Sequence, residues 1–503
     1  MKRKMKQILA MVLALALVLS LAGCGKDAGK DNVKDTAGQT DPTPTTAPEK
    51  EEGEDTAEEV TPEAPEPEEV TYDFGGVTVK VFGSAWNNVD STDDIVRVEA
   101  KTFVEEKYNI KLELAQMEGY DGYNDDDILI ASIAAGDPAA HIINLNPESM
   151  VTSYLNDILF DLTDYLDLLQ VGSIYTDVAS WKGRVYGVAY ENIGDAWTLV
   201  YDRNYLKELG MEKTPTDMFM EGKWDYENAK AYLAELQSKL PDGKYAIGQY
   251  PFHWGVMAAA ANGSYIFNSD GKIGYMDEAL IEATEFYREL MDSGIAFPSY
   301  LIRDAEGKVT ENDIAYAVDD ERIVLKRAEP WQLGGLGFEY GIVFWPWGSN
   351  VTCTGDYTTL SDNYRVAGAY WGMDAVVKAA VDKTGIPGEV LALIAQDYQY
   401  AISDDGKEWM HQAYLDEQGG VQANIGAEFG EPRSFYTEQD IELYDWAHGR
   451  YKADLGWSLD SAGLMKVWRP FQDIYMENTD ARSTLASYYN EAQASLQEVG
   501  LVK

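Results

Sequence analysis

The segment from Trp181 to Asp202 places polar and aromatic side chains between two apolar stretches. At its centre, Tyr190, Glu191 and Asn192 offer a phenol, a carboxylate and an amide. A buried carboxylate needs hydrogen-bond donors, and sugar hydroxyls can supply them. A Lys-Gly pair with β-prone residues on both sides predicts a tight hairpin just before this point. The segment is therefore either the floor of a binding cleft or an ordinary solvent-exposed hairpin.

The sequence lacks the residue patterns of the common catalytic and metal sites. Its four histidines show no metal-ligand spacing. It contains no Gly-x-Ser-x-Gly elbow, no phosphate-binding Gly-x-x-x-x-Gly-Lys-Ser/Thr loop and no Gly-x-Gly-x-x-Gly turn after a strand. Asn268, Asp270 and Gly271 resemble part of a calcium loop, but Ile266 stands at the first ligand position and a turn is the alternative. We expect no metal and no cofactor.

Paired carboxylates are the catalytic arrangement that remains. Glu191 and Asp195 could serve a secreted glycoside hydrolase. With 86 acidic residues in the chain, such a pair arises by chance. A hydrolase would also need a barrel or a sandwich, and the strand–helix units here are too few for eight repeats. The alternative is a binding protein without catalysis, in which aromatic faces stack on sugar rings while amides and carboxylates hold hydroxyls.

Length and composition indicate how many lobes the chain has and which classes of partner it can bind. A length of 503 residues exceeds one core of usual size and predicts two or more lobes. The formal charge of -46 leaves no basic patch, and because phosphate binding needs clustered Lys and Arg, nucleic acid is excluded as a partner. Two cysteines exclude a disulfide framework.

The first 23 residues have the pattern of a secretory signal. Basic residues precede an apolar run over residues 8–19, which is too short for a membrane span. The sequence Leu-Ala-Gly-Cys, ending at Cys24, resembles the lipobox of bacterial lipoproteins and implies cleavage before Cys24 and lipidation of its thiol. Cys353 then has no partner, and we expect a free, buried thiol.

Residues 24–70 are rich in Pro, Thr and Glu. Because almost none of these side chains can bury apolar surface, the segment is predicted to be a disordered tether. A Gly-rich chain of this length spans roughly 40 Å, and proline and like charge extend it further. The tether would hold a folded domain off the cell surface.

From Val77 onward, strand and helix patterns alternate. Strands are predicted from Val77 to Gly83, from Ile110 to Leu114 and from His141 to Leu145, with helices between them. This order predicts a parallel sheet that binds ligands outside the carboxyl ends of its strands. The loop residues placed there are Trp86, Asn87 and Asn146.

Helices dominate after residue 202. Apolar residues repeat at helical spacing over residues 226–240 and 280–291, and two more helices are predicted near residues 461–477 and 483–499. Residues 250–254, Tyr-Pro-Phe-His-Trp, lead into an Ala-rich helix. No repeat of solenoid period is visible.

Four motifs carry a family resemblance through their order and spacing. Residues 103–110 run from a helix into a strand, and residues 130–143 hold a helix, a Gly-Asp-Pro turn and a strand. Residues 183–202 are similar to a hinge segment, and residues 329–331, Glu-Pro-Trp, stand where Gly-Pro-Trp is frequent. Together they resemble the carbohydrate-type extracellular solute-binding proteins of bacterial ABC importers, a group that includes maltose-binding protein.

The resemblance implies an α/β fold of two lobes, each a mostly parallel sheet flanked by helices, joined by hinge strands and closing around a ligand. The N-lobe is expected at residues 71–190 and about 319–372, and the C-lobe at 191–318 and about 373–503. Residues 318–325 replace the usual Phe-x-x-Gly-Lys-x-Ala-Met segment, so the second crossing is weakly marked.

The resemblance also implies a function. A monomer on the outer face of the cell membrane, lipid-anchored through Cys24, would deliver a sugar or oligosaccharide to permease subunits, without catalysis. A peptide is an alternative ligand. Each tryptophan of the expected cleft is either a ligand contact or a core residue. The expected cleft residues are Trp86, Asn87, Asn146, Tyr190, Glu191, His253, Trp254, Trp331, Trp371 and Trp468.

Overall fold

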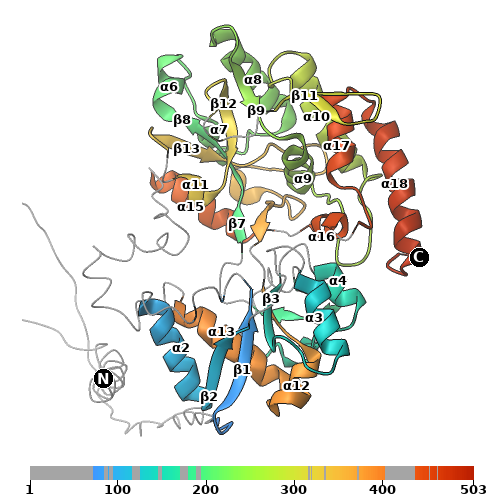
Figure 1. Ribbon diagram of the computed structural model, residues 1–503. Helices are drawn as coiled ribbons and strands as arrows, with labels where there is room; N and C mark the ends of the chain where they lie inside the picture. Colours follow the sequence, from blue (N-terminus) through green and yellow to red (C-terminus); the bar gives the residue numbers. More distant parts are fainter. Residues whose placement is uncertain are drawn as a thin grey trace, which may run out of the picture. The chain divides into compact units, whose positions relative to one another are not determined.

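A computed structural model gives the fold of this chain (Figure 1). The chain divides into two units, Met1–Glu68 and Glu69–Lys503, and the second contains everything described below. The predicted signal, Cys24 and the predicted tether lie outside the described residues. The residues described are 72–83, 86, 89, 95–115, 125–145, 150–169, 179–188, 194–314, 318, 320–333, 336–370, 373–402, 437–451, 454–461 and 463–502.

The first lobe is built on a five-stranded sheet of order β2-β1-β3-β15-β6. Strand β1 pairs in parallel with β2 and β3, while β15 pairs antiparallel with both β3 and β6. One strand therefore runs against the other four, and the predicted first three strands are confirmed. The bounds are β1 Val77–Phe82, β2 Ile110–Leu114, β3 Ile142–Leu145, β6 Gly187–Val188 and β15 Met373–Val376.

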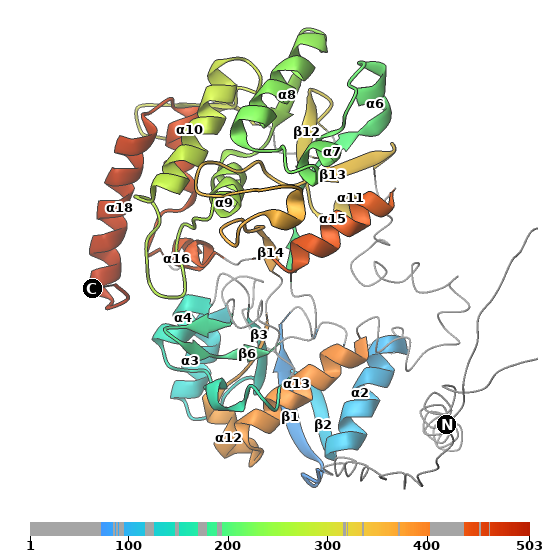
Figure 2. The same ribbon diagram turned by 180° about the vertical axis from the view of Figure 1, so that it is seen from behind.

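Helices flank this sheet, and α13 lies beside α2 (Figure 2). The apolar face of α13, from Val390 to Tyr398, is buried. Helix α3 ends, as predicted, at the Gly-Asp-Pro turn, where Gly136 has a φ of +78°. The helices are α2 Ile95–Tyr108, α3 Asp125–Ala134, α4 Met150–Leu155, η2 Thr163–Tyr165, α12 Lys378–Thr384 and α13 Gly388–Ile402.

The hairpin predicted at the Lys-Gly pair is confirmed. Strands β4 (Ser180–Trp181) and β5 (Arg184–Val185) pair antiparallel across Lys182 and Gly183, whose φ angles are +51° and +78°. Two consecutive residues with positive φ form the turn type whose twist matches that of the strands it joins.

A two-stranded ribbon lies between the two main sheets along the chain. Strand β7 (Gly194–Ala196) follows β6 and leads into the second sheet, and β14 (Gly368–Tyr370) leads back to β15. The two strands pair antiparallel, from Gly368 with Ala196 to Tyr370 with Gly194. The chain thus passes from the first sheet to the second between β6 and β8, within the segment where a crossing was predicted.

The second lobe is built on a four-stranded sheet of order β13-β8-β12-β9. Strand β12 pairs in parallel with β9, and β8 runs antiparallel to both β12 and β13. Again one strand opposes the rest, and in both sheets it is the strand that directly follows a ribbon strand in sequence: β15 after β14, and β8 after β7. The bounds are β8 Thr198–Asp202, β9 Tyr245–Gly248, β12 Ile323–Ala328 and β13 Tyr340–Val343.

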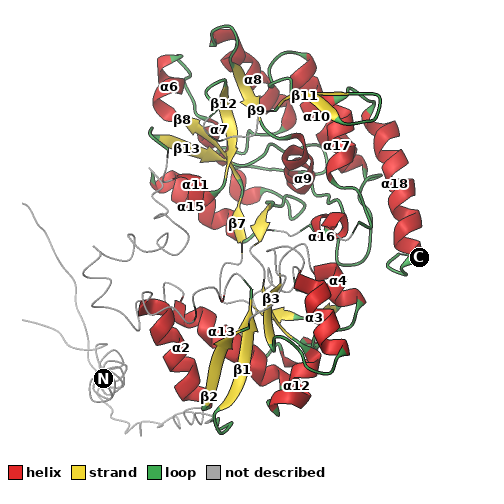
Figure 3. Cartoon of the chain, viewed as in Figure 1, coloured by secondary structure: helices red, strands yellow, loops and turns green. Residues whose placement is uncertain are grey.

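Several helices of this lobe are capped by the side chain that precedes them, among them α6, α7, α8, α15 and α18. Asp225 accepts from two amides at the start of α8, and Thr214 with Asp217 forms a capping box before α7. Figure 3 shows the helices around the sheet. They are α6 Arg203–Glu208, α7 Pro215–Met220, α8 Tyr226–Lys239, α9 Pro251–Ala261, α10 Glu278–Asp292, α11 Pro330–Leu333, α15 Glu438–His448, α16 Gly456–Ser461, α17 Trp468–Met476 and α18 Ala481–Glu498, with β10 Tyr300–Arg303, β11 Val309–Asp313 and η3 Tyr357–Thr359.

The predicted amphipathic helices correspond to α8, α10, α17 and α18, with one correction. The helix predicted from residue 461 begins at Trp468, because Asp460 accepts a hydrogen bond from the backbone N–H of Val467 and a turn separates α16 from α17. The calcium-like segment is a turn in which Asn268 Oδ1 accepts from the amides of Asp270 and Lys272.

Helix α15 is held against the second sheet by a buried carboxylate. Asp440, which is fully buried, accepts two hydrogen bonds of 2.7 Å from Nη2 of Arg203 and one of 3.1 Å from the amide of Ile342 on β13. Thr437 caps the helix and donates to the same carboxylate. The strand β13, helix α6 and helix α15 therefore meet at Asp440.

The pairing corrects the predicted lobe boundaries after residue 318. Strands β12 and β13 belong to the second sheet, whereas β15 and α13 complete the first. Residues 373–402 therefore belong to the first lobe, and β12 does not. The apolar run of β12 fits either sheet locally, so the pattern alone could not decide its partner.

A smaller expectation concerns Cys353. Cys353 is a free thiol, as expected, but it is half-buried, with Sγ 3.3 Å from the carbonyl oxygen of Asp356. Among the helices of the described residues, none has the length and apolarity needed to cross a membrane.

Candidate functional site

One edge of the second sheet gathers the ends of all four strands. The pairs Lys326 with Gly248 and Val343 with Leu199 put the carboxyl ends of β9, β12 and β13 beside the amino end of β8. Ligands of open α/β sheets bind outside such carboxyl ends. The residues next to this edge in sequence are Trp197, Gln249, Tyr250 and Glu329.

An aromatic cluster lies at this edge. Its rings are in mutual contact: Phe252 and Trp468 stack at 4.1 Å between centroids, Trp457 meets Trp468 at 4.8 Å, and Trp197 meets His253 edge-on at 5.2 Å. Such faces suit stacking on the C–H side of a ring. We use the term aromatic cluster for Trp197, Tyr250, Phe252, His253, Trp457 and Trp468.

Local sequence explains how the rings are brought together. Tyr250 is the N-cap residue of α9, and Pro251 at the first helical position fixes the backbone there. Gly255 allows α17 to approach α9 closely, because a Cβ at this position would collide with the ring of Phe471. Trp468, the first residue of α17, is thereby laid over Phe252.

The charged groups beside the cluster neutralise one another. The guanidinium of Arg327 lies 4.8 Å from the ring centroid of Trp197 and forms a 2.7 Å ion pair with Glu329. Burial, and next the charge of Arg327, lower the pKa of His253 well below its usual value. A neutral imidazole and a closed ion pair leave no net charge at this part of the site.

Two buried side chains at the edge have polar atoms without a partner in the part of the chain that the structure describes. These atoms are Nε1 of Trp197 and both amide atoms of Gln249, in residues only 8% and 3% exposed. An unmade buried hydrogen bond costs about 1–3 kcal/mol, so native proteins rarely leave one open. A ligand carrying both donors and acceptors would satisfy them.

At the matching edge of the first sheet lies a buried carboxylate. Asp374, at the start of β15, accepts hydrogen bonds from Nε1 of Trp86 at 2.9 Å, Nδ2 of Asn144 at 3.1 Å and Nε2 of Gln399 at 2.5 Å. Burial raises the pKa of Asp374 to about 7, although the three hydrogen bonds oppose the rise. We call these four residues the Asp374 network.

The raised pKa predicts a dependence of stability on pH. The folded state binds a proton that the unfolded chain releases above its ordinary pKa of 3.8, so the stabilisation is present at low pH and is lost as pH rises through about 7. From pH 5 to pH 8 the loss should be roughly 3 kcal/mol of the free energy of unfolding. Urea titrations should show this loss in the wild type relative to Asp374→Asn; parallel pH profiles of the two proteins would contradict it.

Two of the tryptophans predicted as ligand contacts are buried by the protein itself. Trp254 is fully buried, stacks on Tyr287 at 4.1 Å and donates from Nε1 to the carbonyl of Ala283. Trp86 is fully buried, stacks on Tyr398 at 4.3 Å and donates to Asp374. The burial of both rings matches the core alternative.

The other predicted contacts divide into two groups. His253 and Trp468 lie in the aromatic cluster, and their contact with a ligand stays a prediction. Trp331 lies in α11, and its side chain is outside the described set. Also outside the described residues are Asn87, Asn146, Tyr190, Glu191 and Trp371, together with the side chain of Asp195.

Sequence reasoning missed several members of the site. Gln249 and Tyr250 follow the strand β9 directly, so the carboxyl-end rule could have found them had that strand been predicted. Arg327 lies inside β12, and no local pattern marks it as a neighbour of Trp197. Their proximity depends on sheet order, which is a tertiary property.

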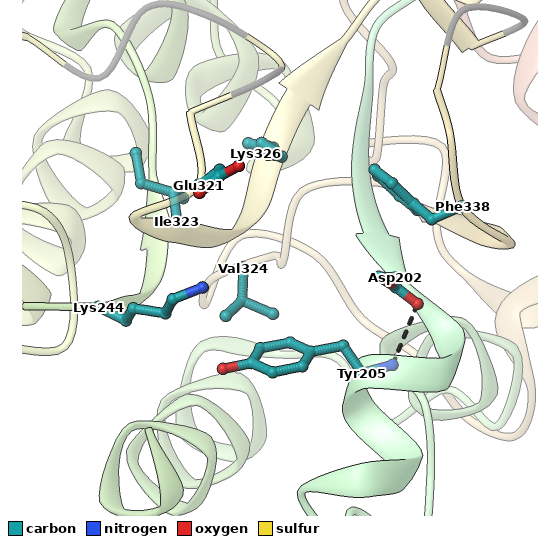
Figure 4. A pocket seen from close by; sticks show the side chains of 8 residues that line it. All are labelled: Asp202, Tyr205, Lys244, Glu321, Ile323, Val324, Lys326 and Phe338. Atoms are coloured by element: carbon teal, nitrogen blue, oxygen red, sulfur yellow. Dashed lines mark hydrogen bonds between the residues drawn. The ribbon is translucent and has the colours of Figure 1, made fainter. Parts of the chain in front are cut away.

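A hollow lies at the opposite edge of this sheet, near the amino ends of β9 and β12 (Figure 4). It encloses about 200 Å³. Asp202 caps α6, and Nζ of Lys244 lies 5.2 Å from the ring centroid of Tyr205. Opposite charges share its wall, so it has no uniform electrostatic preference. The lining residues are Asp202, Tyr205, Lys244, Glu321, Ile323, Val324, Lys326 and Phe338.

No group of three or more His, Cys, Asp or Glu side chains suited to a metal ion occurs among the described residues. The aromatic cluster with its hydrogen-bonding groups is therefore the strongest candidate site in that part of the chain. Its chemistry is that of recognition, through stacking and hydrogen bonding.

Solved structures share the fold over most of their length. The sugar-binding protein MalE of Xanthomonas citri has 13% identity and a TM-score of 0.58, with 84% of this chain and 98% of that chain covered. The galacto-N-biose-/lacto-N-biose I-binding protein of a Bifidobacterium longum ABC transporter has 12% identity and a TM-score of 0.54, covering 85% and 99%. UgpB of Mycobacterium tuberculosis, solved with glycerophosphocholine, has 16% identity and a TM-score of 0.52, covering 84% and 99%.

At these identities the likeness concerns the two-lobed α/β fold alone. A comparison with curated proteins gives no match. The sequence itself matches a protein family over residues 100–382, more than half of the chain. This chain belongs to the bacterial extracellular solute-binding proteins.

Proposed function

We propose that this protein captures a neutral sugar or oligosaccharide and delivers it to the permease of an ABC importer. The observation that carries the proposal is the aromatic cluster beside buried, unpartnered polar atoms of Trp197 and Gln249. A pyranose has apolar C–H faces and hydroxyls that both donate and accept. One such ligand could therefore stack on the aromatic rings and form hydrogen bonds with the buried polar atoms. Two of the similar structures bear names of sugar-binding proteins, which agrees with this ligand class.

The charge balance favours a neutral ligand. Arg327 is already paired with Glu329, so it offers no free cation for a phosphate, and its positive charge over Trp197 disfavours a quaternary ammonium there. His253 is neutral at physiological pH because its pKa is lowered by burial. A glycerophosphodiester, like the one bound by the M. tuberculosis protein, would therefore be a poorer match than a neutral sugar.

Capture would proceed by closure of the two lobes about the β7–β14 ribbon. In each sheet, the strand that precedes the ribbon and the strand that follows it connect to the ribbon at the ligand-binding edge described above. Each lobe would therefore supply one wall of the site. No catalytic step is part of the proposal. Glu329, a carboxylate beside the aromatic cluster, is held in an ion pair with Arg327.

The location follows from the N-terminal sequence and the family. We infer a monomer on the outer face of the cell membrane, held by lipid on Cys24 and by the segment of residues 24–70. More than one acyl chain is needed for stable anchoring, and bacterial lipoproteins of the kind that the Leu-Ala-Gly-Cys sequence resembles meet this need.

A thermal-shift panel tests the ligand class. We expect glucose, maltose, maltotriose, cellobiose or xylobiose to raise the melting temperature, because a ligand at a hundred times its Kd adds about 2.7 kcal/mol to the free energy of unfolding. Glycerophosphocholine and a tripeptide complete the panel. A shift with either of these and with no saccharide would overturn the proposal, and release of reducing sugar from an oligosaccharide would establish the hydrolase instead.

A further inference from the structure

We propose that Asp374 is a positioning residue. It fixes Asn144 on β3 and the backbone turn at Trp86, which follows β1, in the arrangement that ligand binding by the first lobe requires. This role rests on the proposed function, since it concerns the wall that the first lobe supplies. Asp374 itself would touch no ligand.

The position of Asp374 in the sheet supports this role. Its register partner on β3 is Asn144 and its partner on β6 is Val188, so it lies near the carboxyl ends of both strands. The carboxyl end of β1 joins the same edge through the pair of Phe82 with Ile143. Of the five-stranded sheet, the strands β1, β3 and β6 thus end near Asp374.

The three donors of the Asp374 network come from three different elements. Trp86 follows β1, Asn144 belongs to β3 and Gln399 belongs to α13. A carboxylate accepts several hydrogen bonds at once, whereas an apolar side chain at this fully buried position would remove the acceptor that all three donors share. Asp374 is therefore the common point through which these elements are held together.

The surrounding packing leaves little freedom for another arrangement. A Cβ on Gly83 would lie 2.6 Å from Cβ of Asn144, and a Cβ on Gly187 would collide with Met373. The ring of Trp86 is held against Tyr398, whose hydroxyl accepts from Nη1 of Arg97 at 3.5 Å. In a closely packed interior, the displacement of one side chain shifts the side chains that contact it.

The backbone turn at Trp86 provides a readout that needs no ligand. The amide of Trp86 donates to the carbonyl of Gly83, and the amide of Val89 donates to the carbonyl of Trp86, both at 3.0 Å. If Asp374 holds this turn, its removal should increase hydrogen exchange at these two amides selectively. Amides inside the pair β1–β2 should keep their protection.

The experiment compares Asp374→Ala and Asp374→Asn with a matched control, Asp397→Ala. Asp397 is on the same helix as Gln399, but it accepts from the hydroxyl of Tyr108 and pairs with Lys107. In full-length protein, Asp374→Ala should speed exchange at Trp86 and Val89 and weaken binding of the saccharide with the largest thermal shift by about tenfold or more. Asp374→Asn should restore most of both, because its Oδ1 still accepts, and Asp397→Ala should change neither.

Several results would overturn the positioning role. One is unchanged exchange at Trp86 and Val89 in Asp374→Ala, and another is faster exchange spread evenly over the whole first lobe. A third is a lower melting temperature with unaltered saccharide affinity of the folded fraction. If no saccharide binds the wild type, the proposed function fails, while the exchange comparison still decides whether Asp374 holds the turn.

Discussion

Replacing Trp468 with Ala should weaken saccharide binding at least tenfold while the melting temperature stays close to that of the wild type. Trp468 is half-buried, stacks on Phe252 at 4.1 Å and contacts Trp457 and Tyr250 within the aromatic cluster. Truncating an aromatic anchor of a binding site costs about 2 kcal/mol or more of binding free energy. Isothermal titration calorimetry and thermal melting of the same samples measure the two quantities.

Trp254 provides the control, since it is a tryptophan of the neighbouring helix α9 with no exposed surface. Trp254→Ala should lower the free energy of unfolding by about 3–5 kcal/mol, because it leaves a large cavity in the core. The affinity of its folded fraction should be normal. If Trp468→Ala instead behaves like Trp254→Ala, the aromatic cluster is only part of the core.

Replacing Asp440 with Ala should lower the free energy of unfolding by about 3–5 kcal/mol, the usual effect of removing one partner from a buried ion pair. Arg203, with 18% of its side chain exposed, would lose its carboxylate, and the amide of Ile342 would lose an acceptor. Urea denaturation followed by circular dichroism measures the loss. Hydrogen exchange should show it first in α15, which Asp440 and Thr437 hold to the sheet.

An exposed ion pair serves as the comparison for Asp440. Arg482 and Glu278 also approach to 2.7 Å, but 50% and 76% of their side chains are exposed. Solvent screens such a pair, so Glu278→Ala should leave the urea midpoint unchanged within error. Equal losses in Asp440→Ala and Glu278→Ala would show that burial does not decide the strength of these contacts.

Local patterns predicted much of the fold. Alternation marked β1 and β2, and helical spacing marked α8 and α10, because a half-buried strand and an amphipathic helix each carry their own period. The short apolar run that follows the Gly-Asp-Pro turn marked β3. The family motifs added the two-lobed arrangement and the crossing at the hairpin. These features depend on residues close together in the sequence.

Sheet membership and the nature of each tryptophan could not be predicted in this way. Strand β12 is apolar in a manner that suits either sheet, and only its pairing with β8 and β9 assigns it to the second. Trp254 and Trp468 both lie in helices, yet one is enclosed and the other is half-buried. Packing between distant segments decides both questions.

The order of strands in the first sheet has a consequence for synthesis. Strand β15 lies between β3 and β6, yet it follows them by more than 180 residues, after the whole second sheet. When the ribosome has made β6, the first sheet still lacks the strand that joins it to β3, along with the helix α13 that packs against them. The first sheet can therefore be completed only after most of the chain has been translated.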